Sequence, residues 1–259
     1  MSTPVLPELV DALRAIEPLT PRLQTATVTR PGSQAERDAK VRVGRHALEL
    51  AIAALAGGLD HLEAWRQLVL GAGVLPPFAY VTLIRVSIEG AVVGRWLLEP
   101  GLTRDERRSR GLGAQRADYD ERRKFEEQRG MGVPVSGKRA ADRISDLEKM
   151  ANRLGLAIRR PPDRTRLFEL YAIPRAGSLK HPTLGADLYR VLSGSPHGRQ
   201  WTMPGIARHE MVEGLPPAQR IMRLTINEDV AATATQLAVA AMTAAITDVE
   251  AYTASSIAR

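Results

Sequence analysis

The sequence predicts an all-α protein, an antiparallel helical bundle with additional peripheral helices. Three observations favour this class. Apolar residues recur at intervals of three and four in almost every segment, which is the spacing of one face of an α-helix. No segment has the alternation of apolar and polar residues that marks a strand. Glycine and proline fall between the periodic segments, where helices are expected to end.

The first 34 residues are expected to form one short helix and a linker. Leu6–Ile16 carries an amphipathic stripe and is predicted as the helix. The stretch 19–34 is rich in Pro, Thr and Gly and is predicted as the linker. Residues 35–259 are expected to form a single helical-bundle domain, since a chain of 259 residues suits one large domain or two small ones.

Three helices are predicted at the start of that domain. The segment 35–56 has helical spacing and ends at Gly57-Gly58, which is typical of a C-cap. The segment 59–70 follows as a second helix. The segment 78–98 is strongly apolar and stops before a Pro-Gly pair, so it is predicted as a third.

A highly charged helix is predicted from Thr103 to Arg129. Thr103 and Glu106 have the spacing of a capping box, in which each side chain accepts the other residue's backbone N–H. Between residues 104 and 129, 9 Lys/Arg accompany 7 Asp/Glu, so the charges nearly cancel. The sequence therefore predicts a long, exposed helix held by salt bridges.

Residues from about 130 to 180 are expected to form a basic, partly flexible insertion. It has a Gly-rich connection at 130–138 and predicted helices at 138–154 and 164–172. Between residues 138 and 180, 11 Lys/Arg outnumber 5 Asp/Glu. This excess can attract RNA or another polyanion, or it can be an ordinary solvated surface.

The last part of the chain is predicted as two helices separated by an irregular stretch. The segment 184–192 is the first helix, 202–219 is irregular, and the second helix runs from Asn227 to about residue 255. Thr225 and Glu228 repeat the capping-box spacing at the start of the second helix.

Composition narrows the classes of protein and of site. The chain is basic, with a net charge of +7. It has no cysteine, which excludes disulfides, thiolate catalysis and cysteine zinc sites, and which favours the cytoplasm. The uncharged runs 68–84 and 230–247 are broken by Gly and Pro or consist mostly of Ala and Thr, and the first residues lack a signal-peptide pattern. No membrane association is therefore expected.

Neither a metal nor a cofactor is expected. The 5 histidines do not fall at metal-ligand spacing on one helix face. Glycine-rich nucleotide-binding motifs and the motifs of zinc proteases and serine hydrolases are absent from the sequence.

The first candidate site lies on the apolar helix 78–98. Arg85, Glu89 and Trp96 share one helix face, and Arg85 can pair with Glu89 across one turn. If this face is inward, as the apolar surroundings favour, a buried ion pair lies beside an indole and is a candidate site. If it is outward, the pair is a surface salt bridge. His61, near the start of the helix 59–70, is a second candidate, with a structural role as the alternative.

The third candidate site is the stretch YRVLSGSPHGRQW, residues 189–201. Arg190 and His197 are seven residues apart, which on a continuous helix places them on one face. Arginine can hold phosphate oxygens and histidine can move a proton near neutral pH, so the pair suits a phosphodiester site without a metal. The expected supporting residues are Tyr189, Ser193 and Arg199.

Glycine and proline oppose a continuous helix across this stretch. Because Pro196 lacks a backbone N–H, the helix is predicted to end near Ser193, with His197 in the turn that follows. The alternative is that Ser193 and His197 cap the helix end while Trp201 covers the core.

The same stretch resembles a motif, Tyr-x-x-Leu-Ser-x-x-x-His-Gly, of uncharacterised all-helical proteins common in high-GC bacteria. In those proteins it follows an Asp-His-Leu helix and an Arg-x-x-x-Glu…Trp-Leu-x-x-Pro helix. Here Asp60-His61-Leu62 and the segment 85–100 match these elements, and Arg107 and Arg110 match an Arg-x-x-Arg pair. The resemblance covers roughly residues 59–110 and 189–201.

More distantly, Arg190 and His197 are similar to the Arg-x4–6-His signature of HEPN-type domains. That resemblance implies a helical bundle and a metal-independent ribonuclease that acts as a homodimer in toxin or defence systems. It implies that His197 is the acid/base and Arg190 the phosphate-binding residue. Val191 and the Gly-Ser-Pro insertion depart from the family's pattern.

The leading hypothesis is a cytoplasmic, homodimeric ribonuclease or RNA-binding protein, in which a 2′-hydroxyl would attack the phosphodiester. Two alternatives stay open. One is a non-catalytic helical scaffold or interaction protein, and the other is a small-molecule site between helices anchored by Arg85 and Glu89. The position of His197 separates the first two hypotheses. Ribonuclease activity requires it to be solvent-accessible in a basic cleft within reach of Arg190, whereas a scaffold would bury it and bond it to Glu89 or a backbone carbonyl.

Overall fold

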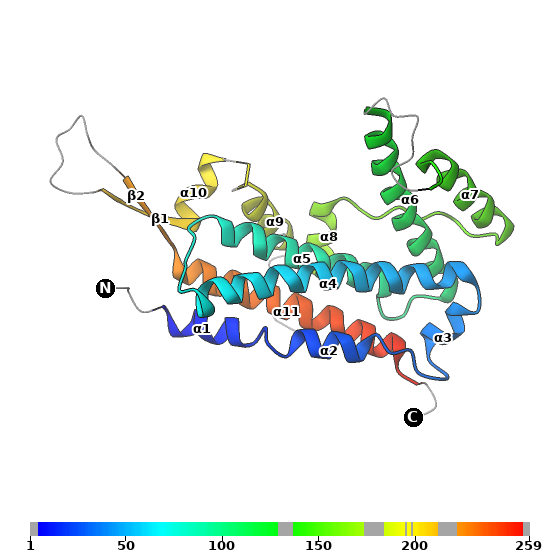
Figure 1. Ribbon diagram of the computed structural model, residues 1–259, viewed down its shortest axis with the longest axis horizontal. Helices are drawn as coiled ribbons and strands as arrows, with labels where there is room; N and C mark the ends of the chain where they lie inside the picture. The colour runs from blue at the N-terminus through cyan, green and yellow to red at the C-terminus, as the bar shows by residue number, and fades with distance from the viewer. Residues whose placement is uncertain are drawn as a thin grey trace. The chain divides into compact units, whose positions relative to one another are not determined.

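The computed structural model describes residues 5–128, 137–173, 184–194, 196–197, 199–211 and 222–255. Helices make up most of these residues, which confirms the predicted all-α class (Figure 1). One antiparallel pair of short strands is the exception.

The chain divides into two compact units, each assembled from several chain segments. Unit 1 comprises Met1–Thr25, Ala54–Val93 and Arg164–Ile246, and unit 2 comprises Ala26–Ala53, Gly94–Asp163 and Thr247–Arg259. Three long helices contribute residues to both: α4 (His46–Arg66), α5 (Ala79–Leu98) and α11 (Glu228–Thr253).

The other elements of unit 1 are short. They are α1 (Pro7–Arg14), α2 (Leu19–Ala26), a π-helical turn η2 (Gln67–Gly71), α8 (Arg164–Tyr171), α9 (Leu184–Gly194), a 3-10 helix η3 (Gln200–Thr202), α10 (Met203–Ile206), β1 (Ala207–Met211) and β2 (Met222–Ile226). The helices predicted at 78–98 and 164–172 are confirmed by α5 and α8. The stretch predicted as a linker contains α2, because its Leu and Ala residues are buried on one face despite the flanking Pro and Thr.

The core of unit 1 is built around two buried aromatic side chains. Trp65 and Tyr80 are fully buried, with ring centroids 5.7 Å apart. Each polar tip has a partner: Trp65 Nε1 donates to Thr235 Oγ1 at 3.0 Å, and the Tyr80 hydroxyl donates to the backbone carbonyl of Ile206 at 3.1 Å. Buried aromatics need such partners, so these bonds fix how α4, α5, α10 and α11 meet.

Glycine allows α4 and α5 to approach closely within unit 1. A Cβ atom on Gly90 would lie 2.3 Å from the Ala54 carbonyl oxygen, and one on Gly58 would lie 3.0 Å from the Ser87 carbonyl oxygen. The predicted C-cap at Gly57-Gly58 is therefore wrong, since α4 continues through both residues to Arg66. Packing against a neighbouring helix outweighs the local tendency of glycine to end a helix.

Two short strands, one within the predicted irregular stretch at 202–219 and one after it, form an antiparallel pair, and residues 212–219 of that stretch lie outside the described residues. The strands β1 and β2 pair antiparallel, with Ala207 opposite Ile226 and His209 opposite Leu224 (Figure 1). Ala207 and Ile226 are buried and hold the hairpin to the rest of unit 1. Among the strand residues whose side chains the structure describes, only these base positions are apolar and buried, so the two strands lack the alternation of apolar and polar residues that predicts strands.

The predicted capping box of Thr225 and Glu228 is also wrong. Thr225 lies in β2 opposite Arg208. The Glu228 carboxylate instead accepts the backbone N–H of Leu6 at 2.8 Å, so it joins the first turn of α11 to the start of α1.

Unit 2 contains α3 (Gln34–Ala39), a 3-10 helix η1 (Arg42–Arg45), α6 (Arg104–Gln128) and α7 (Ala140–Arg153). The segment 35–56, predicted as one helix, is thus divided among α3, η1 and the start of α4. The capping box of Thr103 and Glu106 is confirmed, because Thr103 N donates to Glu106 Oε2 at 2.9 Å and Glu106 N donates to Thr103 Oγ1 at 3.3 Å. The helix predicted at 138–154 is confirmed by α7.

Residues 107–113 of α6 are mostly buried, which corrects the prediction of an exposed helix. A small apolar core forms where α6 and α7 lie side by side (Figure 1), from Val43, Leu112, Leu147 and Ala151. Gly113 approaches the segment after α7 so closely that a Cβ atom would lie 1.7 Å from the Arg159 carbonyl oxygen. The second half of α6 carries the salt bridges that the sequence predicts, such as Arg122 with Glu126 at 2.8 Å.

The predicted flexible connection at 130–138 falls mostly outside the described residues, as do residues 174–180 of the predicted insertion. Within the described chain, α11 is the one helix that is long and apolar enough to cross a membrane, and half of its most apolar window is buried within the protein. The core helix of a soluble protein passes the same test, so this is weak support for a membrane span.

Candidate functional site

The stretch 189–201 is a helix end followed by a tight turn. The helix α9 ends at Gly194, and the Arg199 N–H donates to the Gly194 carbonyl at 2.9 Å. A Cβ atom on Gly194 would lie 2.5 Å from Thr202 Cγ2. Thr202 is buried, and its hydroxyl donates to the Arg199 carbonyl at 2.7 Å. These contacts hold Arg199 and Thr202 against the end of α9.

His197 lies in this turn, as the proline predicts, and its side chain is exposed. Among the described residues it has no hydrogen-bond or ion-pair partner. The scaffold hypothesis required it to be buried against Glu89 or a backbone carbonyl. Glu89 instead accepts from Arg85, and His197 is open to solvent.

Arg190 is also exposed, but it has a partner. Its guanidinium lies 3.0 Å from Asp187 one turn earlier on α9, and both side chains are about half exposed or more (60% and 47%). No hydrogen bond within the described chain joins Arg190 to His197. Because the helix ends at Gly194, the spacing of seven residues does not place the two side chains on one helix face.

Three of the predicted site residues do lie together. Arg85 and Glu89 pair at 2.8 Å on α5, with side chains 20% and 21% exposed. The Arg85 guanidinium lies 5.5 Å from the ring centroid of Tyr189, and that ring packs on Phe168 of α8 with centroids 4.9 Å apart. The face is therefore partly buried, and the cluster joins α5, α8 and α9 in unit 1.

The charges of this cluster are matched. The carboxylate of Glu89 neutralises Arg85, and the Tyr189 ring faces its guanidinium, so little of the cation is left to attract an anion. A structural role follows for Arg85, Glu89 and Tyr189.

The remaining predicted residues are separate from that cluster. His61 donates from Nδ1 to the Gly57 carbonyl at 2.8 Å, one turn earlier on α4, which is a bond within the helix. Ser193 is half-buried on α9. Trp96 belongs to unit 2, where it is buried. The guanidinium of Arg110 lies over it, 5.5 Å from the ring centroid.

Trp201 is the residue whose placement differs most from its sequence interpretation. The alternative hypothesis had it covering the core, yet it is 63% exposed. The other two tryptophans, Trp65 and Trp96, are at most 4% exposed. Arg199 and Gln200, its neighbours in sequence, are exposed as well. One feature of the sequence indicates this exposure: Trp201 directly follows Arg199 and Gln200, and no apolar periodicity surrounds it.

Unit 2 holds a buried charge cluster that sequence reasoning missed. Asp38 is 1% exposed, and its carboxylate accepts from Arg107 Nε at 2.9 Å and from the Tyr252 hydroxyl at 2.9 Å. Arg104 adds a third contact at 3.2 Å. Burial, with the Asp38 carboxylate alongside, raises the pKa of the Tyr252 hydroxyl well above its usual value. The hydroxyl therefore stays protonated as a donor.

The Arg-x-x-Arg pair of the family resemblance has a structural role in unit 2. Arg107 pairs with Asp38, and Arg110 donates to the Trp96 carbonyl at 2.5 Å and to Glu99 at 2.8 Å. Both guanidinium groups lie over aromatic rings, Tyr252 at 5.1 Å and Trp96 at 5.5 Å. This part of the motif thus fixes the packing of the α5–α6 connection.

Several basic side chains of the predicted segment 138–180 are paired where it is described. Lys138 bonds to Asp146, Arg160 lies 3.0 Å from Asp120, and Arg166 lies 2.8 Å from Glu169. These pairs reduce the positive charge available to a polyanion and favour the solvated-surface interpretation.

No group of three or more His, Asp or Glu side chains that can hold a metal occurs among the described residues. No protein-family model, curated protein or solved structure matches the chain, so the site is interpreted from its own residues.

Proposed function

We propose that the protein binds single-stranded RNA on the exposed turn after α9, through a surface that we call the Trp201 surface: His197, Arg199 and Trp201. The observation that carries the proposal is the 63% exposure of Trp201. An exposed indole is a stacking platform for an unpaired base, and a neighbouring arginine can hold the adjoining phosphate.

The net charge of +7 supports the same ligand. A basic protein attracts nucleic acid without regard to sequence, and stacking on an aromatic side chain selects single strands over duplexes. The resemblance to HEPN-type domains implies the same class of substrate.

We propose further that His197 gives this surface a metal-independent ribonuclease activity of the toxin or defence kind. His197 takes the proton of a ribose 2′-hydroxyl, whose oxygen attacks the adjacent phosphorus. The bond from phosphorus to the 5′-oxygen breaks, and water supplies the proton to that oxygen. The products are a 2′,3′-cyclic phosphate and a 5′-hydroxyl.

Arg190 holds a phosphate oxygen in this proposal, in place of Asp187. An exposed ion pair one turn apart contributes no more than about 1 kcal/mol, so a phosphate can displace the carboxylate. Arg190→Ala should then slow cleavage, whereas Asp187→Asn should leave it unchanged or speed it.

Binding is tested with a fluorescein-labelled single-stranded RNA in fluorescence anisotropy. Trp201→Ala should weaken binding about tenfold or more, since stacking contributes about 1–3 kcal/mol per base. Phe125→Ala is the matched control, because Phe125 is another exposed aromatic (45%) on α6 of unit 2. Equal affinities for the two variants would refute the Trp201 surface.

Cleavage is tested with the same RNA in EDTA. Wild type should produce cyclic-phosphate ends and His197→Ala should not. If both cleave equally, or neither cleaves, the ribonuclease proposal fails. RNA binding that still depends on Trp201 would then identify a non-catalytic RNA-binding protein.

The resemblance also implies a homodimer in the cytoplasm, and we carry both into the proposal. Light scattering during gel filtration should give about twice the mass of the 28.3 kDa chain. A monomer at micromolar concentration would remove the dimer from the proposal without affecting the RNA surface.

A further inference from the structure

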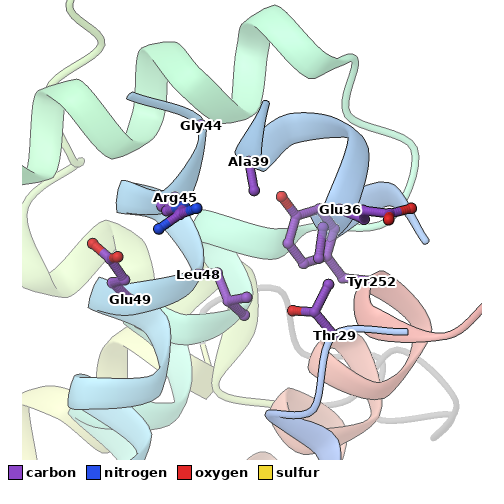
Figure 2. Close-up of a pocket in the computed structure, with 9 residues that line it drawn as sticks. Thr29, Glu36, Ala39, Gly44, Arg45, Leu48, Glu49 and Tyr252 are labelled. Carbon is purple, nitrogen blue, oxygen red and sulfur yellow. The ribbon is translucent and has the colours of Figure 1, made fainter. Parts of the chain in front are cut away.

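Unit 2 contains a pocket far in sequence from the Trp201 surface. Its volume is about 340 Å³, at the lower end of the range for small-molecule sites. Figure 2 shows it between α3, the η1–α4 corner and the end of α11, with Tyr252 forming one wall. Its apolar lining is Ala35, Ala39, Leu48 and the Tyr252 ring.

The walls of this pocket are held in place without a ligand. The Tyr252 hydroxyl is bonded to buried Asp38 at 2.9 Å. Gly44 approaches α3 so closely that a Cβ atom would lie 1.8 Å from the Asp38 carbonyl oxygen. The segment before α3 is tied to the end of α11 by the Arg30 N–H, which donates to the Thr253 carbonyl at 3.1 Å. The pocket is therefore preformed, which lowers the entropic cost of binding.

Two polar side chains of the wall have no hydrogen-bond or ion-pair partner among the described residues. They are the guanidinium of Arg45 and the hydroxyl of Thr29. The two carboxylates of the wall already have partners: Glu36 accepts the Gly32 N–H at 2.7 Å, and Glu49 lies 3.7 Å from His46. The groups left for a ligand are thus a cation and a hydroxyl.

The charges at the edges limit what Arg45 can bind. Figure 2 shows Arg45 and Glu49 on one side of the pocket, with Glu36 on the other and its carboxylate pointing away from Arg45. Two nearby carboxylates and one arginine disfavour a ligand with two or three negative charges, such as a nucleotide phosphate. A single negative charge can pair with Arg45 while an apolar body fills the rest of the pocket.

We propose that this pocket binds a small amphiphilic monocarboxylate. The carboxylate pairs with Arg45, and the apolar part packs on Leu48, Ala39 and the Tyr252 ring. Arginine holds a carboxylate by two parallel hydrogen bonds, and burial of the apolar part supplies most of the affinity. This site lies within unit 2 and does not depend on the proposed RNA function.

Titration calorimetry with octanoate on the full chain tests the proposal, with octanamide as the uncharged analogue. Octanoate should bind wild type at a single site and more tightly than octanamide. Arg45→Gln should lower the affinity for octanoate about tenfold or more and leave octanamide unchanged, since it removes a charged hydrogen-bonding partner.

Arg42→Gln is the matched control, because Arg42 is exposed on the same 3-10 helix but does not line the pocket. It should bind both compounds as wild type does. Ala39→Phe places a ring in the pocket and should abolish binding of both compounds, and far-ultraviolet circular dichroism checks that each variant is folded. The proposal is overturned if octanoate does not saturate wild type at millimolar concentration. Equal affinities for Arg45→Gln and Arg42→Gln would overturn it as well.

Discussion

At the scale of single residues, a buried charge cluster in unit 2 joins α3, α6 and the end of α11. Asp38 is 1% exposed. Its carboxylate accepts hydrogen bonds from Arg107 and the Tyr252 hydroxyl and forms an ion pair with Arg104. A buried ion pair adds little net stability as a whole, but the loss of one member leaves the other charge buried without a partner.

Asp38→Ala should lower the free energy of unfolding by about 3–5 kcal/mol, because Arg107 is left buried without its carboxylate. Urea unfolding followed by circular dichroism measures this. Asp105→Ala is the control: its carboxylate is 72% exposed and lies 3.5 Å from Arg108, so the loss should not exceed about 1 kcal/mol. Similar losses for the two variants would contradict a buried ion cluster.

His46 should make stability depend on pH. Burial lowers its pKa below the usual value of 6.5, although Glu49 opposes the shift. The unfolded chain then takes up the proton first as the pH falls below about 6.5, so stability falls until the pH passes the lower folded pKa.

His46→Gln lacks this titration and should lose less stability than wild type between pH 8 and pH 5, the range that spans the ordinary histidine pKa. Urea unfolding at a series of pH values measures the difference between the two proteins. A difference that does not change with pH, or that grows in the opposite direction, contradicts the assignment.

At the scale of elements, glycine sets the distance between helices. Gly57 and Gly58 are adjacent on α4, yet a Cβ atom on Gly57 meets nothing within 4 Å, whereas one on Gly58 meets Ser87 of α5. Gly90 is the counterpart on α5, where a Cβ atom would lie 2.3 Å from the Ala54 carbonyl oxygen. The helix propensity of glycine is the same at all three positions, so the sequence alone does not distinguish Gly57 from Gly58 and Gly90.

Gly90→Ala should lower the free energy of unfolding by about 1–3 kcal/mol, because the methyl group forces α4 and α5 apart. Gly57→Ala should raise it by roughly 0.5–1 kcal/mol, because alanine restricts the unfolded chain and fits the helix. Thermal unfolding of both variants separates these effects. A free energy of unfolding that rises in both variants would mean that the helices do not meet through Gly90.

At the scale of the whole molecule, most of the described charge is paired. Lysine and arginine number 36 against 29 aspartate and glutamate, so the excess of +7 is modest. Many of the charged side chains of α6 and α7 form ion pairs. In one of them, Arg116 Nε lies 3.2 Å from Glu148 Oε1. Binding of RNA should therefore depend on a few local contacts more than on net charge.

The salt dependence of RNA binding tests that expectation. In a plot of log K for binding against log salt concentration, the slope is about −0.7 for each single-strand phosphate that the protein neutralises. Arg199→Ala should make the slope shallower by about that amount, whereas Arg42→Ala, in unit 2, should leave it unchanged. Equal changes for both variants would indicate binding by overall charge alone.

The sequence alone determined the helical class and most helix positions, since the spacing of apolar residues and the Thr103–Glu106 box are local signals. It also placed His197 in a turn, because Pro196 cannot continue a helix. The errors fall where non-local contacts prevail: α4 runs through Gly57-Gly58, and residues 207–211 pair with residues 222–226 as strands.

Only the tertiary structure decided which predicted site residues meet. Arg85 faces Tyr189 across two helices, Arg190 pairs with Asp187, and Trp201 is exposed. Likewise, the pocket beside Arg45 is bounded by segments about two hundred residues apart in sequence. The physical reason is that periodicity reports which face of a helix is apolar, whereas a site depends on which faces of distant helices pack together.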